Sequence, residues 1–193
     1  VTGNTRPEPV DQSFVGGIAF SPDGRSVYAV HVRGEALTML DIKSGLVKGT
    51  VDVGAEPYTC IVSPDGRTVF VSVWGGAKVL LFDAATLERR AEIRVGEHPN
   101  AMVLSKDGAR LFVACANTNS VWVLDVASNT AKEQVSVALF PDAPPGATPN
   151  GLGLSPDGRT LLVANADHNP VAVMNVSDPA RRRLDGGPGD GAG

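Results

Sequence analysis

The sequence lacks most features of membrane, nucleic-acid-binding and disulfide-bonded proteins. No apolar run approaches the roughly 20 residues of a membrane helix, and the chain does not open with a charged and then apolar export signal. The only dense basic run, residues 181–183, lies in an irregular tail, so nucleic-acid binding is not expected. Cys60 and Cys115 have no metal-binding spacing, and each falls within a predicted strand. Both are predicted to be buried thiols.

Ready-made catalytic motifs are also missing. The sequence contains no Gly-x-Ser-x-Gly elbow and no phosphate-binding glycine loop. Residues 151–153, Gly-Leu-Gly, lack the third glycine and the strand–helix setting of a dinucleotide site. The composition, with 42% hydrophobic and 20% charged residues, is that of an ordinary globular protein. These observations favour a soluble globular chain without a recognisable catalytic signature.

What the sequence does contain is a repeated turn. Ser-Pro-Asp-Gly-Arg occurs at 21–25, 63–67 and 155–159, and the variant Ser-Lys-Asp-Gly-Ala occurs at 105–109. The repeats therefore start 42, 42 and 50 residues apart, which is typical of a four-stranded propeller blade. Proline presets φ, aspartate bonds to the local backbone and glycine supplies a left-handed conformation, so each copy predicts a turn between two strands.

The segments between the turns predict strands in fixed order. Each turn is followed by a strand rich in β-branched and aromatic residues, and then by an almost continuously apolar strand expected to be covered on both faces. A fourth strand alternates and is expected to be half exposed. Residues 84–91 have good helix propensity, but the same columns of the other repeats indicate turn and strand, which we predict there too. The second strands are predicted at 27–30, 69–72, 111–114 and 161–164, and the third at 37–40, 79–82, 121–124 and 171–174.

One repeat resembles a known family closely. Residues 111–125, Leu-Phe-Val-Ala-Cys-Ala-Asn-Thr-Asn-Ser-Val-Trp-Val-Leu-Asp, followed by Ala-Ser-Asn at 127–129, are similar to the YVTN-type β-propeller repeat. Val-Gly-x-x-Pro at 53–57 and 95–99 resembles the connection of that family into its next blade. The resemblance implies a WD40-like propeller related to surface-layer and periplasmic repeat proteins, the heme-bearing domain of nitrite reductases, lactonases and phosphoesterase-fused propellers. It also implies a periplasmic or extracellular location, which the sequence leaves otherwise unknown.

The fold class expected is therefore all-β, a β-propeller with four-stranded antiparallel blades. About four blades are present, and we expect an incomplete arc of a larger, seven-bladed propeller, with missing blades or self-association covering its ends. The fourth repeat stops after Val176 in this interpretation, because the residues that follow are too rich in Gly, Pro and Arg for an outer strand. The expected division is a lead-in at 1–13, blades at 14–177 (repeats 14–53, 54–95, 96–137 and 148–177, with an insertion at 138–147) and a disordered tail at 178–193.

Unusual side chains gather on one predicted face. In the usual propeller topology the loops opposite the Asp-Gly turns share a face, and function concentrates in loops on a rigid scaffold. Tyr58, Asn100 and Asn150 share one position at the start of the innermost strand of their repeats, so they should ring a central channel. The candidate ligand- or partner-binding residues are His31, Tyr58, Trp74, His98, Asn100, Asn150 and His168.

Two functions remain open from the sequence. The preferred one is a non-catalytic scaffold or binding module that presents this face to a protein or small ligand, possibly within a longer chain that carries a phosphoesterase domain. The alternative is a lactonase-like hydrolase, in which His98 or His168 would act as base and Asn100 or Asn150 would polarise a carbonyl. We predict no cofactor and no metal site, because the three histidines come from different repeats without a ligand spacing.

Overall fold

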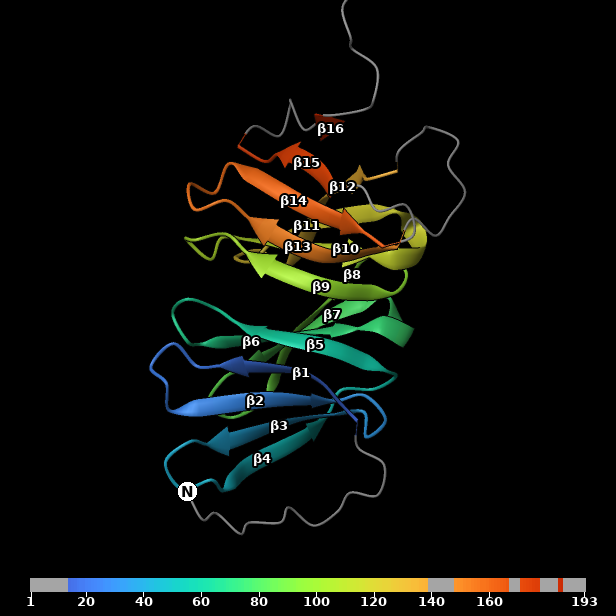
Figure 1. The fold of residues 1–193 in the computed structure, drawn as a ribbon. Helices are drawn as coiled ribbons and strands as arrows, with labels where there is room; N and C mark the ends of the chain where they lie inside the picture. Colours follow the sequence, from blue (N-terminus) through green and yellow to red (C-terminus); the bar gives the residue numbers. More distant parts are fainter. Residues whose placement is uncertain (1–13, 139–147, 167–170, 178–183, 186–193) are drawn as a thin grey trace, which may run out of the picture. The chain divides into compact units, whose positions relative to one another are not determined.

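In the part of the chain that the structure describes, sixteen strands form four antiparallel sheets of four strands each (Figure 1). The computed structural model describes residues 14–138, 148–166, 171–177 and 184–185. Within every sheet the strands follow one another in chain order, as expected of propeller blades. The first sheet comprises β1 (Val15–Phe20), β2 (Ser26–His31), β3 (Ala36–Asp41) and β4 (Val47–Asp52), and the second β5 (Pro57–Val62), β6 (Thr68–Val73), β7 (Lys78–Asp83) and β8 (Arg89–Arg94).

The third and fourth sheets repeat this order. The third comprises β9 (Pro99–Leu104), β10 (Arg110–Cys115), β11 (Ser120–Asp125) and β12 (Thr130–Ser136), and the fourth β13 (Pro149–Leu154), β14 (Thr160–Asn165), β15 (Val171–Asn175) and β16 (Leu184–Asp185). Two short 3-10 helices, η1 (Trp74–Gly76) and η2 (Ala116–Thr118), follow β6 and β10. The all-β prediction is confirmed, and residues 84–91 form turn and strand despite their helix propensity.

The short strand β16 differs from the sequence prediction. The segment 178–193 was expected to supply no outer strand, yet Leu184 pairs with Met174 and Asp185 pairs with Val173. The apolar Leu184 is an exception within a polar segment, so composition averaged over that segment concealed it. The insertion at 138–147 lies outside the described residues, apart from Ala138.

The Asp-Gly turns are built alike in all four sheets. In each, a serine hydroxyl donates to the aspartate carboxylate two residues on, at 2.5–2.6 Å, and the glycine has φ between 69° and 72°. The serine oxygen also accepts a backbone N–H from the start of the next strand at 2.9 Å. The serine hydroxyl is the largest cause of the lowered pKa of Asp23, Asp65, Asp107 and Asp157. The carboxylates thus have a structural role.

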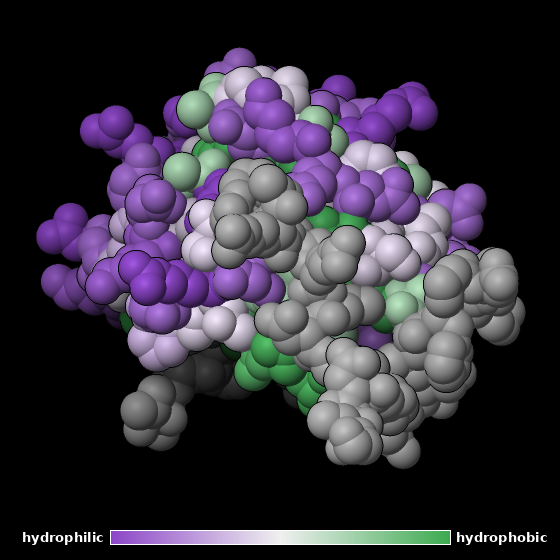
Figure 2. Space-filling view, turned by 90° about the horizontal axis from the view of Figure 1, so that it is seen from above, coloured by the Kyte–Doolittle hydropathy of each residue, from purple (hydrophilic) through white to green (hydrophobic). Residues whose placement is uncertain are grey.

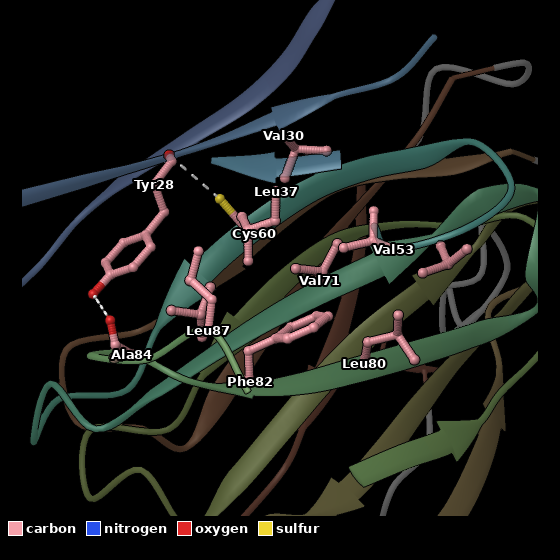
Figure 3. Close-up of a cluster of buried hydrophobic side chains, with 12 residues drawn as sticks. Tyr28, Val30, Leu37, Val53, Cys60, Val71, Leu80, Phe82, Ala84 and Leu87 are labelled. Atoms are coloured by element: carbon pink, nitrogen blue, oxygen red, sulfur yellow. Dashed lines mark hydrogen bonds between the residues drawn. The ribbon is translucent and has the colours of Figure 1, made fainter. Parts of the chain in front are cut away.

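The chain divides into two compact units, residues 1–100 and 101–193. In the first, the first and second sheets pack face to face around Val30, Leu37, Val71, Leu80 and Phe82 (Figure 3). In the second, the third and fourth sheets bury Phe112, Val121, Leu161, Val163 and Met174 between them. Apolar side chains from facing sheets therefore supply both cores.

Two polar contacts lock the first core. The Tyr28 hydroxyl, on the first sheet, donates to the Ala84 carbonyl after β7 at 2.6 Å, and the Cys60 thiol lies 3.6 Å from the Tyr28 carbonyl (Figure 3). Burial raises the pKa of Cys60 to about 12 and also raises that of Tyr28. Cys60 and Cys115 are buried and form no disulfide, as predicted.

Candidate functional site

The loops opposite the Asp-Gly turns in the first unit bring two of the predicted residues into contact. Trp74 opens η1 directly after β6, and His98 stands just before β9. Their rings are stacked, with centroids 3.7 Å apart and planes 7° from parallel. Both side chains are half-buried, so each ring covers part of the other while the pair stays accessible. Trp74, expected to be exposed, is partly covered by this contact.

Backbone geometry places the imidazole. His98 adopts a left-handed conformation, with φ of 54°, directly before Pro99. Glu56 before Pro57 and Thr148 before Pro149 do the same, with φ of 53° and 47°. A non-glycine residue in this region costs about 1–2 kcal/mol, so the repeat of the conformation marks it as part of the connection between sheets. At position 98 the residue in this connection is a histidine, so the connection presents an imidazole ring.

Glycine places the indole. An added Cβ on Gly75 would lie 3.2 Å from the Ala55 carbonyl oxygen and 3.1 Å from the Glu56 carboxylate. The Trp74 backbone N–H donates to the Glu56 carbonyl at 2.9 Å, which ties η1 to the loop before β5. A side chain at position 75 would therefore crowd this approach by a few tenths of an ångström.

Two further candidates occupy β-bulges. The ladder between β5 and β6 pairs Pro57 and Thr59 but skips Tyr58, and that between β13 and β14 skips Asn150. Bulges re-aim side chains at the ends of strands, and Tyr58 is 43% exposed while Asn150 is also exposed. Tyr58 and Asn150 belong to different compact units.

Asn100 is 4% exposed, so its side chain is buried rather than presented to solvent. Its backbone carbonyl accepts a hydrogen bond of 2.9 Å from the Ser72 hydroxyl, which also accepts the Thr59 N–H at 3.3 Å. Ser72 is fully buried. It fixes the start of β9 beside β5 and β6, close in sequence to His98.

His31 is the last residue of β2 and lies at the end of the first sheet opposite its Asp-Gly turn. It pairs with Val15 and Ala36. Its Nδ1 atom is buried and has no hydrogen-bond partner among the described residues, and desolvation lowers the pKa of the imidazole. His31 is thus held in its neutral form more strongly than a solvated histidine. His168 lies outside the described residues.

The opposite side of the first unit has a cavity that the sequence did not predict. It measures about 640 Å³ and is lined by residues that include Asp23, Tyr28, Met39, Asp41 and Asp65. The carboxylates accept hydrogen bonds from their own turns, as when Asp41 accepts the Ser44 hydroxyl and N–H at 2.7 Å each. Residues of the turns therefore line much of the cavity, and its carboxylates already accept hydrogen bonds from those turns.

Within the described part of the chain, no cluster of three or more His, Cys, Asp or Glu side chains is arranged to hold a metal ion. Neither of the helices in that part is long or apolar enough to cross a bilayer. The Trp74–His98 pair thus offers two kinds of chemistry: a flat aromatic surface and the nitrogens of one imidazole.

Comparison with known proteins gives the chain a family. The cytochrome D1 heme domain model matches residues 11–190. The chain belongs to this family. It is a family of eight-bladed β-propellers, so the propeller prediction is confirmed, whereas the match does not extend to the YVTN repeat family. The blade count remains a prediction, and the seven blades expected from the sequence differ from the eight of this family.

Solved structures agree on the fold. The hydrazine synthase of Kuenenia stuttgartiensis superposes with a TM-score of 0.78 at 24% identity, covering 94% of this chain and 52% of the other. Dihydro-heme d1 dehydrogenase NirN, in complex with DHE, superposes with a TM-score of 0.72 at 25% identity, covering 89% and 36%. The chain thus spans about half or less of the proteins it matches. Curated protein sequences give no significant match.

Proposed function

We propose that this member of the cytochrome D1 heme domain family is a binding module whose loop face takes a planar tetrapyrrole of the heme class. The sequence analysis already favoured a non-catalytic binding module. The proposal adds the chemical class of its ligand. The observation that carries the proposal is the stacked Trp74–His98 pair. The family and the name of the NirN enzyme support the same ligand class.

The residues fit such a ligand in kind. A half-buried indole and imidazole, parallel within 7°, present a flat surface of the kind on which a conjugated macrocycle stacks. Histidine nitrogen is a common ligand of heme iron. Because its lone pairs lie in the ring plane, His98 would hold the iron of a macrocycle at the edge of the pair, whereas a macrocycle stacked on the flat surface would be held by ring contact alone. When bound, an iron tetrapyrrole would supply redox or ligand-binding chemistry, whereas this chain would bind and orient it. Tyr58, exposed on the bulge of β5, is a further candidate contact in the same unit.

Fluorescence and absorption together test the proposal. Trp74 and Trp122 are the two tryptophans of the chain, so Trp122→Phe leaves Trp74 as the single emitter. Titration of this variant with heme d1, and separately with protoheme, should quench the emission and shift the main absorption band of the ligand. Trp74→Ala, in otherwise native protein, should weaken binding about two- to twelve-fold, from the loss of about 0.5–1.5 kcal/mol of stacking.

Two variants separate stacking from ligation. His98→Phe keeps an aromatic ring but removes the nitrogens, so it should retain quenching and lose the part of the absorption shift that depends on iron–nitrogen bonding. Phe20→Ala is the control, because Phe20 is an exposed aromatic residue beside an Asp-Gly turn, away from the loops. Binding that survives both Trp74→Ala and His98→Phe, or no binding of either heme, would refute the proposal.

The lactonase-like alternative gains no support from the Trp74–His98 contact, which engages the face of the imidazole rather than positioning it as a base. Loss of lactone hydrolysis in His98→Ala would be needed to revive it. A phosphoesterase domain elsewhere in a longer chain remains a hypothesis from family resemblance.

A further inference from the structure

Each ring of the stacked pair is attached to a short buried segment. Trp74 directly follows residues 72–73, which are fully buried at the end of β6. His98 directly precedes residues 99–100, which are buried at the start of β9. Both segments and both rings belong to the first compact unit. The relative position of the two half-buried rings therefore depends on how these two buried segments are held together.

One side chain connects the two segments. The Ser72 hydroxyl donates to the Asn100 carbonyl at 2.9 Å and accepts the Thr59 N–H at 3.3 Å. The Thr59 carbonyl is a second acceptor at 3.5 Å, so the bond to Asn100 is the shorter of the two. Ser72 stands two residues before Trp74, and Asn100 stands two residues after His98. The hydrogen bond thus joins the two strands close to the points where the rings leave them.

The hydroxyl of Ser72 lies where a polar group needs a partner. Hydrophilic side chains cover most of the described surface in the view of Figure 2, whereas Ser72 is fully buried. Burying a hydroxyl is unfavourable unless it is hydrogen-bonded, and a hydroxyl has only one proton to donate. Because the shorter donor contact is to the Asn100 carbonyl, breaking it has a cost that holds the segment 99–100 in place beside β6.

The sheet itself does not require a hydroxyl at this position. The equivalent residues of the other three repeats are apolar or small: Val30, Ala114 and Ala164. The column of Trp74 is also apolar in those repeats, with Val32, Ala116 and Ala166. The buried hydroxyl therefore occurs in the same repeat as the indole.

We propose that Ser72 is a positioning residue that sets the stack of Trp74 on His98 and thereby shapes the ligand surface. The ring centroids are 3.7 Å apart, which is within the roughly 3.5–4.0 Å of carbon–carbon van der Waals contact. A small shift of residues 98–100 relative to β6 therefore opens or offsets the stack. The effect of Ser72 on ligand binding rests on the proposed function, whereas its effect on the stack does not.

Proton NMR of the full, ligand-free chain tests the effect on the stack. An indole stacked on an imidazole shifts the imidazole ring hydrogens upfield through its ring current. Trp74→Ala gives the unstacked reference, and His98→Phe identifies the His98 signals among those of the three histidines. Ser72→Ala should move the His98 signals most of the way to the unstacked reference. Alanine occupies this column in the third and fourth sheets, so the variant should fold.

Two further variants separate positioning from a general loss of stability. Ser72→Cys keeps a weaker donor and should move the His98 signals part of the way. Ser63→Ala is the matched control, because Ser63 is 6% exposed and its hydroxyl is hydrogen-bonded at the opposite end of the second sheet. It should leave the His98 signals at their native positions. Unmoved signals in both Ser72 variants would overturn the proposal, as would an equal displacement in Ser63→Ala.

Heme titration tests the effect on binding. Ser72→Ala should weaken heme binding by no more than Trp74→Ala does, and it should cause a smaller further loss in the Trp74→Ala chain than in the native chain. Equal losses in the two backgrounds would mean that Ser72 acts independently of the stack, which would overturn its positioning role. If the native chain binds neither heme, the proposed function fails and NMR alone decides the role of Ser72. Native heme binding with unmoved His98 signals refutes only the role of Ser72.

Discussion

Replacing Gly17 by alanine should push β1 away from β5. In the first unit these inner strands run so close that a Cβ on Gly17 would overlap Thr59 Oγ1 and would lie 2.8 Å from Thr59 Cα and 2.9 Å from Thr59 Cβ. The hydroxyl can turn aside, but the Cα belongs to the backbone of β5. The strand must therefore shift by roughly 0.6–1 Å to restore van der Waals contact, which also disturbs the packing behind it.

The size of the effect follows from two opposing terms. Overpacking a core costs about 1–3 kcal/mol, and Gly→Ala returns about 0.4–1 kcal/mol by restricting the unfolded chain. The net loss should be about 1–2 kcal/mol of unfolding free energy. For a chain of this size that lowers the melting midpoint by roughly 2–8 °C.

Gly153→Ala provides the matched control. Gly153 lies in the first strand of the fourth sheet, and an added Cβ there would meet nothing within 4 Å. This variant should gain about 0.4–1 kcal/mol. For Gly17→Ala, denaturant unfolding of the first unit is followed by the fluorescence of Trp74 in the Trp122→Phe background. For Gly153→Ala, unfolding of the second unit is followed by the fluorescence of Trp122 in a Trp74→Phe background. A Gly17→Ala protein as stable as its parent would refute the close contact.

Two further variants probe polar contacts. Tyr28→Phe should lower the unfolding free energy by about 1–2 kcal/mol, because the buried Ala84 carbonyl loses its donor while Phe70 shows that the ring alone fits this column; an unchanged denaturation midpoint would contradict this. Ser63→Ala should raise the pKa of Asp65 toward its ordinary 3.8, since the serine hydroxyl is the largest cause of its lowered value. The lowered pKa gives stability that is present above about pH 3.8 and is lost as the pH falls through the folded-state pKa. The Ser63→Ala variant should therefore lose less stability than the native protein on acidification. A carboxyl NMR titration in which the pKa of Asp65 does not change would count against the bond.

Much of the fold could be predicted because its signals are local. The Asp-Gly turns carry their own hydrogen bonds within five residues, so four copies of one motif predicted four sheets and the order of strands in each. The apolar third strands β7 and β11 are mostly buried, as predicted, whereas Val171 of β15 is 57% exposed. The strand β16 was missed because one leucine in a polar segment carries little signal until its partner, Met174, is known.

The candidate site depended on features that sequence patterns do not carry. Trp74 and His98 were both assigned to the loop face, but their contact goes with the left-handed backbone of His98, which no sequence pattern indicated. Tyr58 and Asn100 share a column, yet a bulge exposes the first and the second is buried.

The sequence by itself determined the repeat, the turn chemistry and the alternation of buried and exposed strands, since each depends on residues that are near one another in the chain. Tertiary structure alone decided which rings stack and which glycine is crowded. Those properties depend on atoms brought together from distant repeats, and small backbone rotations at bulges and left-handed residues fix them.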